Sequence, residues 1–263
     1  MYPTLFQIFG FRIDTYSVIW FTALSFAIIW VLKRLKIYDI DENEARNVMS
    51  VSFLFMLLGA RMPEYIENWK IYSADPILII KNFNAGGIHE IGAVSGALIS
   101  AMLLCLLKRK KISFLKLAEA ASVCALLAIA VGRWGCFMNG CCVGEISDFC
   151  LAVHFPNDEI GITRHPVQIY YSVFAFVSIL ILLFIEKLIS RSHDISKSHS
   201  ILAPLSLILF TVMRFVIIPV RDGKTFIEGF NHYEGYSVLL WALPFEILWL
   251  LYGLRRLKSV KIL

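Results

Sequence analysis

The chain has 263 residues, of which 58% are hydrophobic, 14% aromatic and only 17% charged. This composition excludes an ordinary soluble domain of this size and is typical of a polytopic membrane protein. The net charge of +5 does not indicate a nucleic-acid partner, because the basic residues gather beside apolar runs, where they set topology and contact lipid head groups. We therefore expect an all-α, multi-pass protein in which residues 1–263 form one integral-membrane domain.

Seven apolar segments can be drawn along the chain, and all but the second approach the length that crosses a bilayer. They are 16–32, 48–60, 91–107, 114–131, 169–185, 201–220 and 238–254. Most Lys and Arg residues follow the first, third, fifth and seventh segments, and such basic loops stay in the cytoplasm. The pattern predicts an external N-terminus, a cytoplasmic C-terminus and an active extracytoplasmic face, because the long loops 61–90, 133–168 and 221–237 then lie outside.

The stretch 132–144, G-R-W-G-C-F-M-N-G-C-C-V-G, directly follows the fourth segment. Its four glycines disfavour a helix interior, and an arginine, an asparagine and three cysteines follow within a few residues. Irregular polar backbone at a membrane boundary is tolerated only where protein or water satisfies it. We therefore expect the helix to break here and the stretch to line a cavity.

Arginines occur at or inside the limits of apolar segments. Arg133 lies at a segment end, whereas Arg214 has apolar residues on both sides. A charge at such a position costs at least about 2.5–3.5 kcal/mol on insertion scales, and a guanidinium group there either pairs with another group, reaches the interface or holds a phosphate. Arg221 follows Arg214 by two helical turns and would share its face, unless Pro219 bends the helix.

Four cysteines, Cys136, Cys141, Cys142 and Cys150, lie in or near the predicted external loop. Their C-x4-C-C-x7-C pattern matches zinc-site spacings poorly. Disulfide bonds, buried free thiols and a nucleophilic thiol at Cys136 or Cys141 remain alternatives.

Few other side chains could move protons or fix a head group. His89 and Glu90 stand at the mouth of the third segment, either as a helix start or as a general base. Gln168 would face the bundle from its external end. Tyr16 could offer a hydroxyl at the same level or belong to an aromatic belt.

These motifs together resemble the prolipoprotein diacylglyceryl transferase family over most of the chain. The stretch 132–144 is similar to the family signature G-R-x-G-N-F-x-N-G-E-x-x-G, and residues 164–170, R-H-P-V-Q-I-Y, are similar to its R-H-P-S-Q-L-Y. Arg214-Phe215 followed by Arg221-Asp222 resembles R-F-x-x-E-x-x-R-x-P-D, and Tyr16 falls where the family has a tyrosine in the first segment.

Several positions depart from the family pattern. The histidine of H-G-G-L-x-G falls on Ile91, and the first asparagine and the glutamate of the signature fall on Cys136 and Cys141. The glutamate of R-F-x-x-E falls on Ile218. The set that would hold a phosphate is intact: Arg133, Asn139, Gly144, Arg214 and Arg221.

The resemblance implies transfer of the diacylglyceryl group of phosphatidylglycerol to the lipobox cysteine thiol of a preprolipoprotein, in the bacterial plasma (inner) membrane and among its lipids. Glycerol phosphate would leave as a thioether forms. Assigned catalytic roles go to Arg133, Arg214, His89 and Tyr16, and substrate-binding roles to Arg133, Asn139, Gly144, Gln168 and Arg221. No cofactor or metal is assigned to this reaction.

Two other interpretations keep the fold. In one, Cys136, Cys141 and Cys142 serve a different transfer, metal or redox role. In the other, the chain is a non-catalytic lipid-binding protein that retains the arginines.

Overall fold

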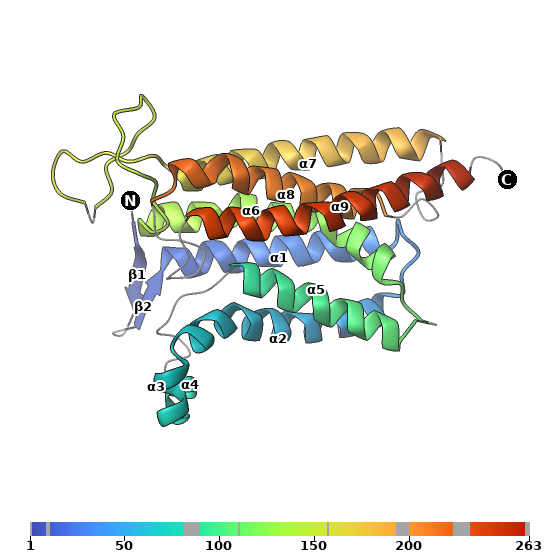
Figure 1. The fold of residues 1–263 in the computed structure, drawn as a ribbon, viewed down its shortest axis with the longest axis horizontal. Helices are drawn as coiled ribbons and strands as arrows, with labels where there is room; N and C mark the ends of the chain where they lie inside the picture. The colour runs from blue at the N-terminus through green and yellow to red at the C-terminus, as the bar shows by residue number, and fades with distance from the viewer. Residues whose placement is uncertain are drawn as a thin grey trace. The chain divides into compact units, whose positions relative to one another are not determined.

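The computed structural model describes residues 2–8, 11–81, 90–109, 111–156, 158–192, 200–222 and 232–260 (Figure 1). Most of these residues are helical. Strands β1 (Thr4–Ile8) and β2 (Phe11–Asp14) form an antiparallel pair ahead of the first helix. The prediction of an all-α chain missed this hairpin, because its two short strands precede the apolar segments on which the prediction was based.

The seven predicted segments fall within helical structure, except that Ile201 precedes the first residue of its helix. The helices are α1 (Thr15–Leu35), α2 (Glu42–Glu67), α3 (Trp69–Ala74), α4 (Ile77–Lys81), α5 (Glu90–Leu107), α6 (Phe114–Asn139), α7 (Val167–Ser192), α8 (Leu202–Ile217), the 3-10 turn η1 (Ile218–Val220) and α9 (His232–Val260). Among the described residues, four helices are long and apolar enough to cross a membrane: α1, α6, α7 and α8 with η1. Gly92–Leu107 of α5 forms a shorter apolar helix. The chain is thus a helical membrane protein, whereas seven crossings and the sidedness of the termini stay predictions.

The chain divides into two compact units. The first unit comprises Met1–Asp39, Leu115–Gly223 and Tyr236–Leu263, and the second comprises Ile40–Phe114 and Lys224–Gly235. The single domain 1–263 stays a prediction.

Helices α2 and α5 pack closely in the second unit. A Cβ added to Gly59 would lie 2.3 Å from the Gly92 carbonyl oxygen, and one added to Gly96 would lie 2.3 Å from the Phe55 carbonyl oxygen. Small residues on both helices let the two backbones approach, as is common between membrane helices. Helix α2 begins well before the predicted segment because the Asp41 carboxylate caps it, accepting a 2.8 Å hydrogen bond from the Glu44 amide.

Helix α6 is central to the first unit. Half of its membrane-length window is buried, against 22% for α1, 28% for α7 and 44% for α8. Figure 1 shows α1, α6, α7 and α8 running along a common direction. Their shared apolar core includes Val123, Leu126, Val167, Ala175, Leu182, Met213 and Ile217.

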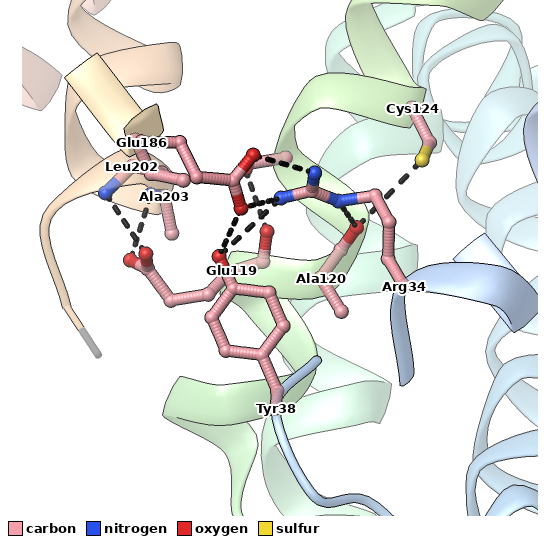
Figure 2. Close-up of polar contacts among 9 residues, drawn as sticks. Arg34, Tyr38, Glu119, Ala120, Cys124, Glu186, Leu202 and Ala203 are labelled. Carbon is pink, nitrogen blue, oxygen red and sulfur yellow. Dashed lines mark hydrogen bonds and ion pairs between the residues drawn. The ribbon is translucent and has the colours of Figure 1, made fainter. Parts of the chain in front are cut away.

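A buried ionic cluster joins α1, α6 and α7 at one end of this bundle (Figure 2). The Arg34 guanidinium donates two 2.8 Å hydrogen bonds to the Glu186 carboxylate and a third, of 3.0 Å, to the Ala120 carbonyl oxygen. The Tyr38 hydroxyl donates a further 3.0 Å bond to Glu186. We call Arg34, Tyr38, Glu119 and Glu186 the Arg34–Glu186 cluster.

Glu119 of this cluster caps α8 from another helix. Its two carboxylate oxygens accept the Leu202 and Ala203 amides at 3.0 and 2.9 Å (Figure 2). These are the first amides of α8, which have no partner within the helix, and a carboxylate there also interacts favourably with the helix dipole. The cap holds the α8 N-terminus to α6, and thereby sets where the opposite end of α8 lies.

Candidate active site

Two arginines from separate helices lie against one tyrosine ring. Arg133 of α6 and Arg214 of α8 have guanidinium carbons 4.3 and 5.5 Å from the centroid of the Tyr171 ring of α7. All three residues are buried, with at most 5% of their surface exposed. Guanidinium groups are stabilised over an aromatic face, and two of them at one ring concentrate positive charge, which favours an anion. The structure therefore brings together the two arginines that the sequence singled out.

Gln168 lies one helical turn before Tyr171 and is fully buried. Its side-chain Nε2 donates a 2.6 Å hydrogen bond to the Cys141 carbonyl oxygen. Among the described residues, Gln168 Oε1 and the Tyr171 hydroxyl have no hydrogen-bond partner although both atoms are buried. Buried polar atoms rarely stay unpartnered, so both are available to a bound head group. We call Arg133, Gln168, Tyr171 and Arg214 the arginine cluster.

Tyr171 was not predicted as a site residue. The motif comparison drew attention to Tyr170 instead, whose hydroxyl lies 3.1 Å from His165 Nδ1. The sequence nevertheless indicated Tyr171, because Gln168 and Tyr171 are three residues apart and residues at this spacing share a helix face. If Gln168 faces the bundle, Tyr171 does so too.

Close packing of α1 on α6 brings Tyr16 to the same region. A Cβ on Gly132 would lie 2.7 Å from the Trp20 ring, and one on Gly135 would lie 3.2 Å from the Tyr16 carbonyl oxygen. Tyr16 is half-buried and close enough to interact electrostatically with Arg133. The glycines of the signature therefore serve helix packing, and they do not break the helix.

The predicted break at residue 132 is wrong, because α6 continues to Asn139. The helix ends at Gly140, whose φ of +69° suits glycine. The Gly140 amide bonds to the Phe137 carbonyl oxygen, and the Cys141 amide bonds to the Cys136 carbonyl oxygen, both at 3.1 Å. This pair of bonds is the Schellman motif, in which the residue two beyond the helix lies against the residue three before its end. It places Cys141 beside Cys136.

Three cysteine thiols meet at this helix end. The Sγ atoms of Cys136, Cys141 and Cys142 all lie within 4.8 Å of one another. Cys136 is buried, Cys141 is half-buried and Cys142 is exposed. We call these residues the thiol cluster.

Hydrogen bonds from the Cys136 and Cys141 thiols hold the pKa of Cys142 well below its ordinary value of 9.0. The positive charges of Arg133 and Arg221 act in the same direction. Cys142 is therefore the member of the thiol cluster whose ionised form is most favoured.

All six cysteines are free thiols. Cys105 and Cys124 are buried within helices, as expected for apolar packing. Cys150 is exposed and lies outside the thiol cluster.

Gly144 lies between two other backbone segments. Its amide donates a 3.0 Å bond to the His165 carbonyl oxygen, and it pairs with Arg221 in an isolated antiparallel bridge. A Cβ there would lie 2.6 Å from both the His165 and the Val220 carbonyl oxygens, so only glycine fits. This contact ties the chain after α6 to the segments before α7 and after α8, and a direct contact of Gly144 with substrate stays a prediction.

Arg221 does not continue the α8 helix. Helix α8 ends at Ile217, η1 carries Pro219, and Arg221 is extended with φ of −87° and ψ of 136°. Of the two alternatives that the sequence left open, the structure shows the one in which Pro219 ends the register, so Arg214 and Arg221 do not share one helix face. Arg221 nevertheless lies near the site, because its charge acts on Cys142.

Asn139 is the last residue of α6, and its side chain lies close to the Cys141 thiol. His89 lies outside the described residues, and so do the side chains of Glu90 and Ile91. The general-base role assigned to His89 therefore stays a prediction.

Membrane-length helices with buried guanidinium groups near one end of their bundle define a helical membrane protein. A sequence model described as "Prolipoprotein diacylglyceryl transferase" matches residues 3–250. The chain belongs to this family.

Individual relatives agree over most of their length. The chain is 35% identical to the phosphatidylglycerol–prolipoprotein diacylglyceryl transferase of Clostridium novyi (strain NT), over 85% of this chain and 86% of that one. It is 27% identical to the corresponding transferase 2 of Clostridium perfringens (strain 13 / Type A), over 97% and 96%. The transferase of Clostridium tetani (strain Massachusetts / E88) is 29% identical, over 81% and 86%.

Proposed function

We propose that this chain is a transferase that moves the diacylglyceryl group of phosphatidylglycerol to the lipobox cysteine of a prolipoprotein. The observation that carries the proposal is the convergence of Arg133 and Arg214 on the Tyr171 ring. Its relatives, which match over most of their length, bear the names of both substrates. These names favour the transferase over a non-catalytic lipid-binding protein.

The arginine cluster binds the lipid phosphate in this proposal. Guanidinium groups bind phosphate oxygens with charge-assisted hydrogen bonds, and Arg133 and Arg214 approach from two helices. The Tyr171 hydroxyl donates to the same phosphate or to the head-group glycerol. Gln168 Oε1 accepts a hydrogen bond from a glycerol hydroxyl, and Tyr16 and Asn139 limit the space beside it.

The transfer is a nucleophilic substitution at the diacylglyceryl carbon that carries the phosphate. The acceptor thiolate forms the carbon–sulfur bond while the carbon–oxygen bond breaks, and the electron pair leaves on the phosphate oxygen. Negative charge therefore grows on the departing glycerol phosphate. Fixed positive charge at that place lowers the barrier without reorganisation, and such stabilisation is often the largest catalytic contribution.

The reaction is proposed to occur at the extracytoplasmic face of the bacterial inner membrane. Arg133, Tyr171, Arg214 and Tyr16 all lie at the bundle end opposite the Arg34–Glu186 cluster. Basic residues lie near the helix ends at that cluster, with Lys33 in the last turn of α1, Lys36 directly after α1 and Lys187 in the C-terminal part of α7, and basic flanks stay cytoplasmic.

Mass spectrometry of a lipobox peptide tests the proposal directly. The purified protein, peptide and phosphatidylglycerol are incubated together, and the peptide is expected to gain one diacylglyceryl group on its cysteine as glycerol phosphate appears. A peptide with serine in place of the cysteine is the control. Unmodified peptide under conditions where a related transferase is active would refute the proposal.

A further inference from the structure

The thiol cluster has the dimensions of a metal site. Zinc binds thiolate sulfur at about 2.3 Å with tetrahedral geometry, so two sulfurs on one ion lie about 3.8 Å apart. The three Sγ atoms all lie within 4.8 Å of one another, so side-chain rotations that move them by about 1 Å reach this spacing. Thiolate sulfur is a ligand that selects soft metal ions.

The backbone already holds these thiols in place. The Schellman bonds from Gly140 and Cys141 close the end of α6 and set Cys141 against Cys136. Cys142 has φ of +58°, a conformation that residues other than glycine seldom adopt. Gln168 fixes the turn from α7 through its bond to the Cys141 carbonyl oxygen. Three ligands held by local hydrogen bonds need little reorganisation to bind an ion.

The surrounding charge suits a zinc–thiolate group. Three thiolates and one Zn²⁺ carry a net negative charge, and Arg133 and Arg221 are near enough to Cys142 to act on it. Arg133 also lies on the Tyr171 ring. A metal at the thiol cluster would therefore lie beside the place where the phosphate is proposed to bind.

A metal at this position would also meet a chemical need. Thioether formation requires the acceptor thiol to lose its proton, and a thiol that coordinates zinc is deprotonated outright. Zinc sites in enzymes have three protein ligands and leave a fourth position for water or substrate. The thiol cluster supplies three ligands.

We propose that Cys136, Cys141 and Cys142 bind one Zn²⁺ ion, and that its fourth position takes the acceptor thiol. The site itself stands on the geometry above, while the acceptor role rests on the proposed transferase function. Coordination releases the thiol proton to water, the sulfur then forms the carbon–sulfur bond, and zinc keeps its oxidation state throughout. Cu⁺ binding and a Cys136–Cys141 disulfide are competing outcomes of the test.

Metal analysis of the purified protein tests the site. About one Zn²⁺ per chain is expected after dialysis against a weak chelator, with zinc lost in Cys136→Ser, Cys141→Ser and Cys142→Ser. Cys150→Ser is the matched control and should keep its zinc, because Cys150 lies outside the thiol cluster. Zinc-free wild-type protein, copper in place of zinc, or zinc retained in all three variants would overturn the site.

Cobalt substitution of the unaltered protein gives a second readout that does not depend on the folding of a variant. Co²⁺ bound by three thiolates shows a sulfur-to-metal charge-transfer band and the visible bands of a tetrahedral ion. Absence of that band in protein loaded with Co²⁺ would also overturn the site.

A separate measurement tests whether the acceptor thiol binds the metal. Adding a lipobox peptide with cysteine should intensify the charge-transfer band of the cobalt protein, whereas the serine peptide should leave it unchanged. An unchanged band with both peptides would overturn the acceptor role. If the band responds but no thioether forms with phosphatidylglycerol, the proposed transferase function fails while the metal site stands.

Discussion

The two ends of the first unit use buried arginine in opposite ways. At one end the Arg34 guanidinium is matched by the Glu186 carboxylate, the Ala120 carbonyl oxygen and Tyr38. At the other end two guanidinium groups approach the same neutral ring. The first arrangement neutralises charge within the chain and ties α1, α6 and α7 together, whereas the second brings two guanidinium groups to one ring, as the proposed phosphate site requires. A buried arginine is thus a structural or a functional residue according to what is gathered around it.

The largest expected effect is a loss of stability when the Arg34–Glu186 cluster is broken. Arg34→Ala leaves the Glu186 carboxylate, which is 12% exposed, without its ionic partner, and such a change costs about 3–5 kcal/mol. Thermal unfolding in detergent should show a clearly lower midpoint. Arg46→Ala is the matched control, because the Arg46–Glu42 pair is exposed and should be within about 0.5 kcal/mol of neutral. Equal midpoints for the two variants would contradict a structural role for the Arg34–Glu186 cluster.

The next largest effect is expected on the rate of diacylglyceryl transfer. Arg133→Ala and Arg214→Ala are each expected to lower the rate of transfer by about 100-fold or more, because each removes a preorganised charge at the departing phosphate. The amount of each variant protein in the membrane should match that of Arg46→Ala. Full activity in either variant would refute the assigned role of that arginine.

A smaller effect is expected from the Tyr171 hydroxyl. Tyr171→Phe keeps the ring under both guanidinium groups and removes the buried hydroxyl, at a cost of about 1 kcal/mol, or roughly fivefold in KM for phosphatidylglycerol. Tyr252→Phe is the control, since Tyr252 is 49% exposed. If KM is the same in both variants, the Tyr171 hydroxyl does not contact the lipid.

The smallest effect concerns the thiol cluster in protein freed of metal by a chelator. The pKa of Cys142 is lowered, so its thiolate persists at pH values below 9.0, and alkylation of Cys142 should already be fast near neutral pH. Cys136→Ala removes the strongest hydrogen bond to that sulfur and should move the rate profile to higher pH. A wild-type rate that rises only near pH 9.0 would contradict the lowered pKa. Peptide mapping after brief alkylation gives the rate at this one site.

Much of the helical framework could be predicted from the sequence. The seven apolar runs each lie almost wholly in a helix, although only four helices among the described residues are long and apolar enough to cross a membrane, and charge at the apolar segments singled out Arg133 and Arg214. Two kinds of feature could not be predicted from the sequence. The end of α6 was placed too early because Gly132 and Gly135 look like helix breakers until Trp20 and α1 are packed on them.

Tyr171 and the thiol cluster were not predicted for a related reason. A tyrosine in an apolar segment is unremarkable in sequence, and its role follows only when two other helices bring guanidinium groups to its ring. The cysteines showed poor metal spacing in sequence because their closeness comes from a helix-ending turn. Asn139-Gly140 was the local signal for that turn, since glycine after the last helical residue is typical of a Schellman motif.

A double-mutant cycle on lipid binding tests the central claim most directly. Phosphatidylglycerol affinity is measured by native mass spectrometry for the wild type, Arg133→Gln, Arg214→Gln and the double variant. If both guanidinium groups hold one phosphate, the two substitutions should be coupled by more than about 0.5 kcal/mol. Binding losses that add within that margin would mean that Arg133 and Arg214 act at separate places, and the shared phosphate site would be wrong.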